Sequence, residues 1–531
     1  MRTFRLSLVT MAVLGTFVSA TSAAVTSNSI FGTSTTIEDD VVLTNNKQLT
    51  FTDGSKADFG IWTTSGNTVK LTGNKIILNV AGAGTKSAYV ATAATGGNLV
   101  LGNSDSTIEI NASSNDTTIG LWAAGAKDKQ GGTLSINGKS LVVKASAAGE
   151  KGLVYGLYAQ NASIGTTAAK AALIVNSENT LIDAKADVAG NAHGLVVMSE
   201  GVMEIKGNLE VNADTAISAR GGAVLKVNES NTKTVKLNGI IDFNYDGPTS
   251  GTKVDADVTV NLTGPESYWN GNAQYSYNGK PSDDKLSVSG LKLGISAGAV
   301  WNVTKTVEES SAATGAKTVA INQLTFNDGI ISVPDAAQTV QIENMTGTGG
   351  TINARTVKND DGSFSVAKLA VGNVVGAATL TENYVGINAD DVTSEDLDNL
   401  KAVTADAATL TREQVVSEGD INGGLSRVVN PDGTKGEVLE TKNTKQDAYQ
   451  TLTAMNALAW RHEMNDLTKR MGELRDSPVG IGSWARLYGS EQEYGDQNLK
   501  TRSTSVQVGT DFPVGENWKV GAARVCVDFC V

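Results

Sequence analysis

The chain has 531 residues, a formal net charge of −13, and only 19% charged and 5% aromatic residues. This length is too great for one compact domain unless the architecture is a repeat solenoid. Nucleic-acid binding needs a clustered basic surface, and no such cluster occurs, so composition excludes that class of protein. Short Thr- and Val-rich runs between Gly and Asn residues favour β structure with many turns.

Residues 1–24 have the pattern of a secretory signal peptide. A positively charged start precedes an apolar run over residues 6–18, and small residues follow, so we expect cleavage after Ala23 or Ala24. The alternative is an N-terminal membrane anchor. The run is shorter than the roughly 20 apolar residues that a spanning helix needs, which argues against an anchor.

Residues 25–392 contain two recurring strand patterns. In the first, a small residue is followed by an apolar residue and then usually an aromatic or apolar one: Gly60-Ile61-Trp62, Ala88-Tyr89-Val90, Gly120-Leu121-Trp122, Gly156-Leu157-Tyr158 and Gly194-Leu195-Val196. In the second, a polar turn leads into an alternating strand, as in residues 72–80, 137–143 and 206–212. Such spacing is typical of a repeat architecture.

These patterns predict an all-β solenoid, a parallel β-helix. A strand rises ~3.3 Å per residue, so a rung of roughly 20 to 25 residues closes a three-sided coil with turns. Each rung buries its inward face by stacking on its neighbours, with side chains such as Ile76, Leu78, Val80, Leu209 and Val211 pointing inward. An array of β-sandwiches is the alternative. Its strands should pair in antiparallel hairpins, and two-residue hairpin signals are scarce here.

A more specific pattern follows in residues 293–304, where a small-residue turn precedes Trp301, and it continues in residues 324–331 and 347–352. It resembles a rung near the C-terminal end of pertactin-like passengers. The resemblance implies a right-handed β-helix. It also implies that residues 290–390 form an autochaperone-like end, which folds first after export and templates the rest.

The composition changes in residues 393–443, which we interpret as a linker. Thr393 or Ser394 is placed to cap a short acidic helix. Later in the linker, the turn residues Asn430-Pro431-Asp432-Gly433 predict a hairpin.

The period becomes helical in residues 444–476, with one weakly apolar face and one charged face. This helix is too polar to lie in lipid and is suited to a water-filled pore. Residues 477–531 then alternate, with Arg486 on one face and Ala485 and Leu487 on the other, as expected of barrel strands between lipid and lumen.

Residues 460–476, followed by Gly482-Ser483-Trp484-Ala485-Arg486, resemble the linker helix and first strand of autotransporter translocator domains. The resemblance implies type V secretion of a β-helix passenger that is displayed at the cell surface or released. It also implies the outer membrane and its barrel-assembly machinery as partners. Translocators of this family have more strands than residues 477–531 supply. Because lipid tolerates no open sheet edge, we expect the barrel to be truncated and this chain not to insert as a functional translocator.

Residues 463–475 look especially like secreted serine-protease autotransporters, in which a helix Asn inside the pore cyclises and releases the passenger. The matching pair here is Asn465 and Asp466, where the family has Asn at the second position. An amide needs an activating base, and the family's bases lie in later strands. Asn465 has the alternative of being a solvated helix residue.

Catalytic and metal-binding patterns are missing, so we expect no enzyme and no cofactor. Ser104 lacks a glycine elbow, His193 is expected at a solenoid corner, and His462 lies in the predicted pore helix. No Cys/His cluster occurs, and the spacing of Cys526 and Cys530 reads as incidental. The acidic run over residues 390–398 lacks the glycine-turned geometry of a Ca²⁺ loop and reads as a solvated face.

Two functional classes remain: a non-enzymatic adhesin or surface-interaction module, and an enzyme passenger of protease or lipase type. A third alternative is a non-functional autotransporter fragment. An inserted enzyme domain should interrupt the strands with a His-containing segment. The most irregular stretch, residues 244–284, instead holds the aromatic residues Tyr245, Tyr268, Trp269, Tyr275 and Tyr277. We interpret this stretch as a carbohydrate- or protein-binding loop. It favours an adhesin that binds a protein or glycan on a host or neighbouring cell, located at the outer membrane and cell surface.

Overall fold

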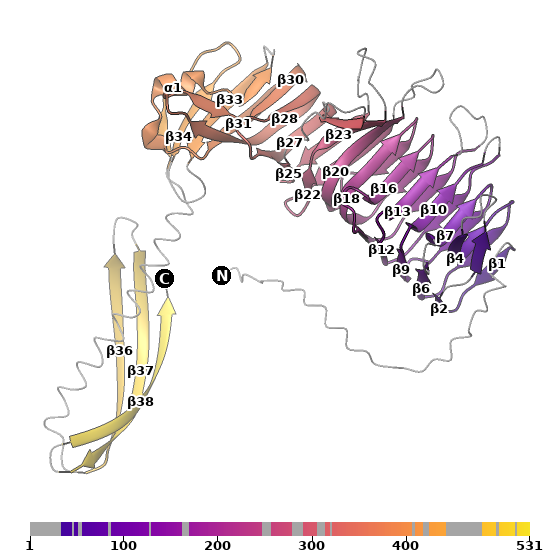
Figure 1. Ribbon diagram of the computed structural model, residues 1–531. Coiled ribbons are helices and arrows are strands. Elements are labelled where there is room, and N and C mark those ends of the chain that lie inside the picture. The colour runs from indigo at the N-terminus through magenta and orange to yellow at the C-terminus, as the bar shows by residue number, and fades with distance from the viewer. Residues whose placement is uncertain are drawn as a thin grey trace. The chain divides into compact units, whose positions relative to one another are not determined.

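The computed structural model describes residues 33–44, 47–50, 56–82, 87–126, 129–161, 169–246, 256–278, 290–304, 314–318, 321–405, 409–417, 424–441, 480–494, 499–515 and 518–530. Most of them form a parallel β-solenoid of about 10 turns (Figure 1). The prediction of an all-β parallel solenoid is therefore confirmed, and the right-handed sense stays a prediction.

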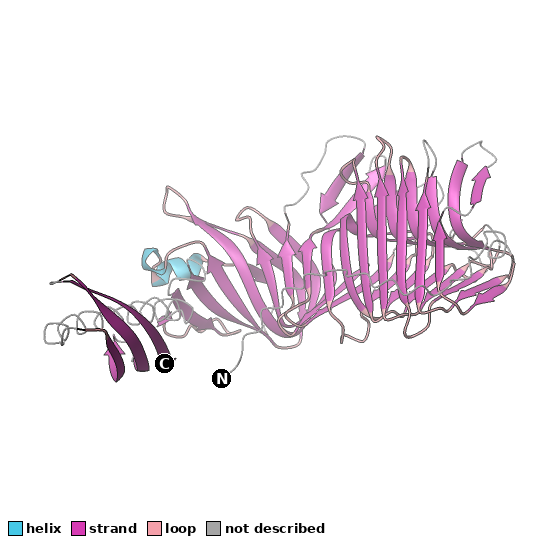
Figure 2. Ribbon diagram, turned by 90° about the horizontal axis from the view of Figure 1, so that it is seen from below, coloured by secondary structure: helices cyan, strands magenta, loops and turns pink. Residues whose placement is uncertain are grey.

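The solenoid strands stack in three columns, in which each strand pairs in parallel with its counterpart one turn later (Figure 2). The first column contains β1 (Thr35–Ile37), β5 (Thr68–Leu71), β8 (Asn98–Leu101), β11 (Thr133–Ile136), β14 (Ala172–Val175), β17 (Val202–Ile205), β19 (Val224–Val227), β21 (Asp257–Thr263), β24 (Leu291–Ser296), the first parts of β27 (Ile321–Val333) and β28 (Thr339–Lys358), β30 (Lys368–Val375) and β32 (Val403–Ala405). The second contains β2 (Val41–Thr44), β6 (Lys75–Ala81), β9 (Thr107–Ser114), β12 (Ser140–Ala147), β15 (Asn179–Ala186), the first parts of β18 (Asn208–Arg220) and β20 (Val235–Asp246), β22 (Tyr268–Gly271), β25 (Val300–Val303), the later parts of β27 and β28, and β31 (Ala378–Val385).

The third column is shorter and contains β4 (Lys56–Thr63), β7 (Ser87–Ala94), β10 (Thr117–Ala124), β13 (Leu153–Gln160), β16 (Ala192–Met198), the later parts of β18 and β20, and β23 (Ala273–Asn278). Among the described residues, β3 (Lys47–Thr50) pairs with β4, β26 (Thr314–Thr318) with β23, and β29 (Phe364–Val366) with β28, each in antiparallel fashion. The parallel stacking excludes the alternative of hairpin-built sandwiches for this region.

The solenoid core is built from alternating apolar side chains, because successive strand residues point to opposite faces. The residues predicted to point inward, Ile76, Leu78, Val80, Leu209 and Val211, are at most 2% exposed. The sequence pattern therefore identified the buried face of the second column correctly.

The triplets of the first sequence pattern stack in the third column. Leu121 pairs with Leu157, which pairs with Leu195, as the repeated triplets predict. The alignment of Ala88-Tyr89-Val90 with them is wrong, because Ala91 and not Tyr89 pairs with Leu121. Val90 replaces the glycine of the other turns, and the small-apolar-aromatic pattern therefore selected a triplet two residues too early.

Two tryptophans fill the core of the middle turns. Trp269 and Trp301 are fully buried and stacked, with ring centroids 4.8 Å apart and an interplanar angle of 7°. The Trp269 Nε1 donates to the carbonyl of Gly239 at 2.9 Å, and the Trp301 Nε1 donates to that of Gly271 at 3.0 Å. A Cβ on Gly271 would lie 2.1 Å from the Gly239 oxygen, so the close approach requires glycine there. The interpretation of Trp269 as part of a binding loop is therefore wrong.

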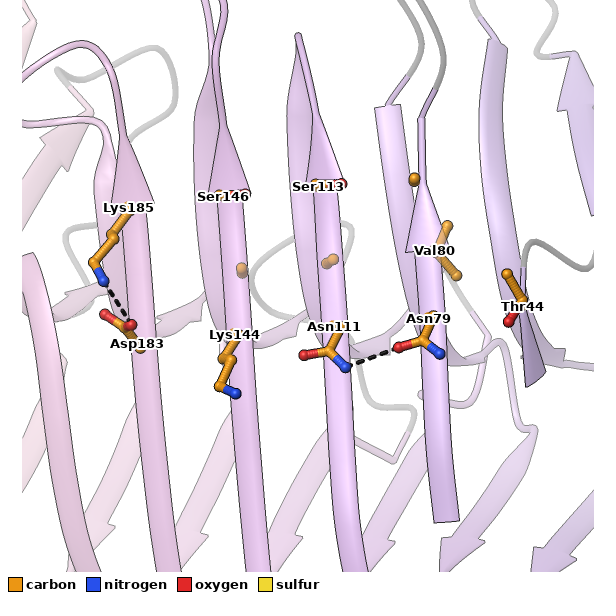
Figure 3. A pocket seen from close by; sticks show the side chains of 12 residues that line it. Thr44, Asn79, Val80, Asn111, Ser113, Lys144, Ser146, Asp183 and Lys185 are labelled. Atoms are coloured by element: carbon orange, nitrogen blue, oxygen red, sulfur yellow. Dashed lines mark hydrogen bonds and ion pairs between the residues drawn. The ribbon is translucent and has the colours of Figure 1, made fainter. Parts of the chain in front are cut away.

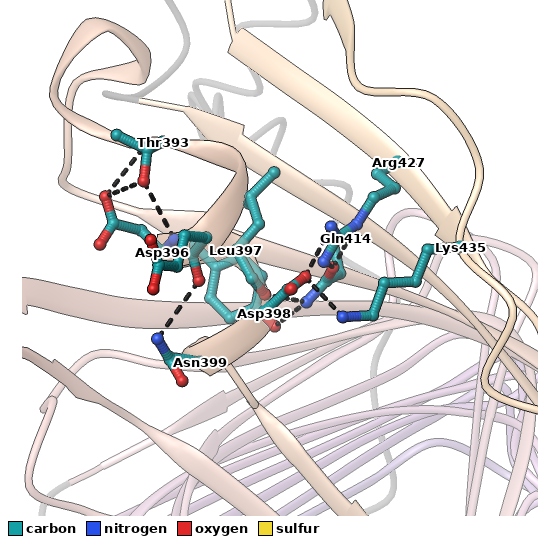
Figure 4. Close-up of polar contacts among 10 residues, drawn as sticks. Thr393, Asp396, Leu397, Asp398, Asn399, Gln414, Arg427 and Lys435 are labelled. Carbon is teal, nitrogen blue, oxygen red and sulfur yellow. Dashed lines mark hydrogen bonds and ion pairs between the residues drawn. The ribbon is translucent and has the colours of Figure 1, made fainter.

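Residues 393–443, predicted as a linker, contain several short elements. They are α1 (Ser394–Asn399), β32, β33 (Leu410–Ser417), β34 (Gly424–Val429) and β35 (Leu439–Thr441), and the 3₁₀ turn η1 (Ala389–Asp391) precedes them. The predicted cap is confirmed, because the Thr393 Oγ1 accepts from the backbone N–H of Asp396 at 3.1 Å (Figure 4). The predicted hairpin is also confirmed, because β34 and β35 pair in antiparallel fashion.

The chain divides into two compact units, and the second unit includes a separate antiparallel sheet of β36 (Gly482–Tyr494), β37 (Leu499–Val514) and β38 (Trp518–Cys530). Its register pairs Leu487 with Val506 and Phe512 with Val520, so these exposed apolar side chains share one face. The predicted signal peptide (Ala23, Ala24), helix 444–476 and cleavage pair (Asn465, Asp466) lie outside the described residues. No helix among the described residues is long and apolar enough to cross a membrane.

Candidate functional site

The outer surface of the second column carries one continuous row of polar residues. The strand registers align one residue per turn from β2 to β31, and every aligned position is polar. We call this set the polar row: Thr44, Asn79, Asn111, Lys144, Asp183, Asn212, Asn238, Asn270, Asn302, Ser332, Asn353 and Asn383. All of these side chains are exposed or half-buried, so they form a surface and not part of the core.

Six asparagines of the polar row each donate an amide N–H to the side chain of the row residue on the preceding turn. The bonds are Asn111 to Asn79 at 2.8 Å, Asn238 to Asn212, Asn270 to Asn238 and Asn302 to Asn270 at 2.8 Å each, Asn353 to the Ser332 Oγ at 3.2 Å, and Asn383 to Asn353 at 2.9 Å. An amide both donates and accepts, and neighbouring strands lie ~4.8 Å apart, so stacked asparagines satisfy one another along the axis.

The polar row is interrupted at β12 and β15, where Lys144 and Asp183 replace asparagine (Figure 3). Among the described residues, no side-chain hydrogen bond joins Asn111 to Lys144, Lys144 to Asp183, or Asp183 to Asn212. Lys144 lies 3.7 Å from a Glu109 oxygen, and Asp183 pairs with Lys185 of its own strand at 2.8 Å. We call these two turns the row break.

A groove of about 340 Å³ runs along the polar row and over the row break. It spans β2, β6, β9, β12 and β15, with Thr44, Asn79, Asn111, Lys144 and Asp183 among its lining residues (Figure 3). A second groove of about 310 Å³ lies on the same column near the starts of β12, β15, β18 and β20. The outward, half-buried Val142 and Leu181 line this second groove. The surface therefore combines hydrogen-bonding edges with an apolar strip.

The outer surface of the third column carries an aromatic cluster instead. Its ring contacts run from turn to turn through Phe59, Tyr89, Trp122, Tyr158 and Tyr155 to His193. Trp122 and Tyr158 are stacked at 5.7 Å, and Tyr158 is 7% exposed. The rings largely cover one another, so this cluster stabilises the column and offers less open surface than the polar row.

His193 lies within β16, so the prediction that it occupies a corner is wrong. The triplet beginning at Gly194 marks a strand and not a turn, which the sequence pattern did not distinguish. Burial lowers the pKa of His193 to about 4, and the nearby Asp214 carboxylate partly opposes this shift. No described residue hydrogen-bonds its Nδ1. Its ring packs against Tyr155 at 5.5 Å.

The other residues singled out in the sequence do not assemble into one site. Ser104 lies in a turn before β9. Tyr268 points outward from β22, two residues before Asn270 of the polar row. Tyr245, Tyr275 and Tyr277 lie on β20 and β23 of the third column. Across the described residues, no group of three or more His, Cys, Asp or Glu side chains could hold a metal ion.

Sequence reasoning missed the polar row, although part of its signal was visible. Asn79 lies in residues 72–80 and Asn212 in residues 206–212, two of the segments for which inward side chains were predicted. Both asparagines occupy outward positions near the ends of these segments. Aligning the second strand pattern turn by turn would have shown a polar residue at the same position each time. No protein-family model matches the chain, and no solved structure matches it significantly.

Proposed function

We propose that the chain is an autotransporter-type outer-membrane protein whose solenoid is a surface-displayed adhesin or interaction module. The observation that carries the proposal is the polar row, which gives one face of the solenoid a continuous hydrogen-bonding surface over most of its length. A repetitive surface of this kind, with Lys144 and Asp183 as its only charged row positions, suits contact with an extended partner more than catalysis. The ligand would be a protein or glycan of a host or neighbouring cell.

The sheet β36–β38 supports the export half of the proposal. Leu487, Val506, Val508, Phe512 and Val520 are each at least 45% exposed, while Gln507, between two of them, is buried. Apolar and polar residues alternate in the same way on strands that face lipid on one side and a polar lumen on the other. We propose that these strands begin the translocator barrel, with residues 444–476 as the helix inside its pore.

Surface display is tested in a Gram-negative host by adding protease to intact cells. The test protein joins residues 1–475 to a translocator barrel of known function. The fusion should lose its solenoid to protease while periplasmic proteins stay intact, and the cells should adhere to host-cell or bacterial surfaces. A fusion whose solenoid stays protected would contradict the proposal.

An enzyme passenger of protease or lipase type is the second candidate. No arrangement of described residues favours it. His193 is half-buried, packs against Tyr155 and lies in the third column, whereas Ser104 lies in a turn that leads into β9 of the second column. A test of the secreted solenoid on casein and on ester substrates would identify such an activity, and we expect none.

A further inference from the structure

We propose that the row break is a binding subsite for an extended, neutral oligosaccharide. This inference rests on the proposed function as a surface-interaction module and assigns a ligand class to one part of its polar face. The subsite consists of the groove over β2, β6, β9, β12 and β15 together with the apolar strip of Val142 and Leu181.

Hydrogen-bonding capacity is the first argument. From Asn212 to Asn302 and from Ser332 to Asn383, side-chain hydrogen bonds join each turn to the next, so a ligand there would have to displace an existing bond. At the row break, the Asn111 Oδ1 accepts no bond from any described residue, and Lys144 has only the 3.7 Å contact with Glu109. Asp183 accepts only from Lys185 within the described residues. Asn111, Lys144 and Asp183 thus present spare hydrogen-bonding capacity on three adjacent turns, and all three line the groove (Figure 3).

Charge balance is the second argument. Lys144 and Lys185 are matched by Glu109 and Asp183, so the subsite carries no net charge. A polyanion would gain from the lysines and lose as much from the carboxylates. A neutral ligand whose groups both donate and accept can use all four side chains, and sugar hydroxyls have that property.

Shape is the third argument. The first groove crosses five neighbouring strands, so its length is about 19 Å, from four spacings of ~4.8 Å. This is the length of an oligomer and not of a single sugar. Val142 and Leu181 lie beside the row break on β12 and β15, where the apolar face of a sugar ring can pack while its hydroxyls reach Lys144 and Asp183.

The decisive variant replaces both charged residues of the row break with asparagine. Replacing Lys144→Asn and Asp183→Asn together gives an uninterrupted asparagine row from Asn79 to Asn302. Because the added amides can bond as their neighbours do, the double variant should fold and melt no lower than wild type. It should bind neutral oligosaccharide about 10- to 100-fold more weakly, since bonds from charged groups to the ligand are lost.

A matched control exists on the first column. Lys292 and Asp257 form an exposed ion pair at 2.9 Å, and replacing both with Asn makes the same chemical change away from the groove. The full chain, the row-break variant and this control are purified and titrated with hexasaccharides of glucose, xylose and N-acetylglucosamine, and with oligogalacturonate. Wild type and control should bind at least one neutral hexasaccharide more tightly than the anionic oligomer.

Equal binding by wild type and the row-break variant would overturn the inference, as would preference for oligogalacturonate or failure to bind any neutral probe. These outcomes are distinct from failure of the proposed function. Titration of purified protein does not depend on where the chain is located in the cell. Displayed fusions that adhere to cells while purified protein binds no sugar would overturn the subsite and leave the adhesin proposal intact.

Discussion

At the scale of single residues, the stacked indoles of Trp269 and Trp301 are the largest fully buried side chains among the described residues. Trp301 is fully buried, stacks on Trp269 and donates its N–H to Gly271. Trp301→Ala would remove the ring contact, leave a cavity and strand the glycine carbonyl. We expect a loss of about 3–5 kcal/mol in the free energy of unfolding, measured by urea titration followed by far-UV circular dichroism.

The control for this change is Val42→Ala, because Val42 is 57% exposed and should cost less than about 0.5 kcal/mol. Trp301→Phe keeps the apolar ring and loses the hydrogen bond, so its cost should fall between the two. Equal midpoints for Trp301→Ala and Val42→Ala would show that the stacked pair contributes nothing.

His193 should make solenoid stability depend on pH. Its pKa in the folded chain is lowered to about 4, mainly by burial, from an ordinary value of 6.5. Between these two values the unfolded chain binds the proton more tightly, so stability is full above pH 6.5 and falls as the pH drops toward 4. From pH 7 to pH 5 we expect a loss of about 2 kcal/mol, measured by urea titration at both values.

His193→Gln separates this effect from other titrations, because glutamine carries no ionisable group. The variant should show nearly the same urea midpoint at pH 7 and pH 5, whatever its absolute stability. A decline as steep as that of wild type would assign the pH dependence to other groups.

At the scale of elements, α1 is held by a polar cluster around Arg427 (Figure 4). The buried Arg427 guanidinium donates to the Gln414 Oε1 at 2.7 and 3.1 Å and pairs with Asp398 at 2.8 Å. Gln414 in turn donates to the carbonyl of Leu397 in α1 at 2.9 Å. Arg427→Met should loosen α1, and its amides should exchange hydrogen about tenfold faster in mass spectrometry.

Lys435→Met is the matched control, because Lys435 also pairs with Asp398 but is 42% exposed, and it should change exchange less. Hydrogen bonds from Lys435 and Arg427 hold the pKa of Asp398 below its ordinary value of 3.8. The stabilisation is therefore present above pH 3.8 and is lost as the pH falls through the lower pKa of the folded state. Exchange in α1 that is unchanged by Arg427→Met at pH 7 would contradict this account.

The geometry of β38 forbids a disulfide between Cys526 and Cys530. Four residues of an extended strand span about 13 Å, whereas bridged cysteines have Cα atoms at most ~6.8 Å apart. Peptide mapping by mass spectrometry under non-reducing conditions should therefore find no bridge between Cys526 and Cys530 within one chain. A peptide that contains this bridge would show that β38 is not a strand in solution.

Elements were predictable from sequence where the signal is local and periodic. Ile76, Leu78 and Val80 alternate, and Thr393 precedes a short acidic run, so the second column and the α1 cap followed directly. The burial of Trp269 could not be predicted from the sequence, because an aromatic residue in an irregular stretch is as compatible with a binding loop as with a core. Only the stacking of β22 on β25, a contact across one turn, decides between them. The polar row was missed for the same reason.

At the scale of the whole molecule, the solenoid is a one-dimensional array in which each turn contacts chiefly the turns before and after it. Stability in such an array is approximately a sum of turns and of interfaces between neighbours. The row break is compatible with this, since a weaker link between two turns need not unfold the rest. A substitution that destabilises one turn should therefore affect chiefly that turn and its neighbours.

Gly156 offers a direct test of this locality. A Cβ there would lie 2.5 Å from the Ile182 Cγ2 and 2.8 Å from the Gly194 oxygen, so Gly156→Ala must displace the neighbouring turn. Overpacking of this kind costs about 1–3 kcal/mol, and it should speed hydrogen exchange in β10, β13 and β16. Strands β24 and β27, several turns away, should keep their protection. Gly436→Ala is the control, because its Cβ would meet only ordinary contacts at 3.5 Å or more. Faster exchange through all turns at once would mean that the solenoid unfolds as one cooperative body.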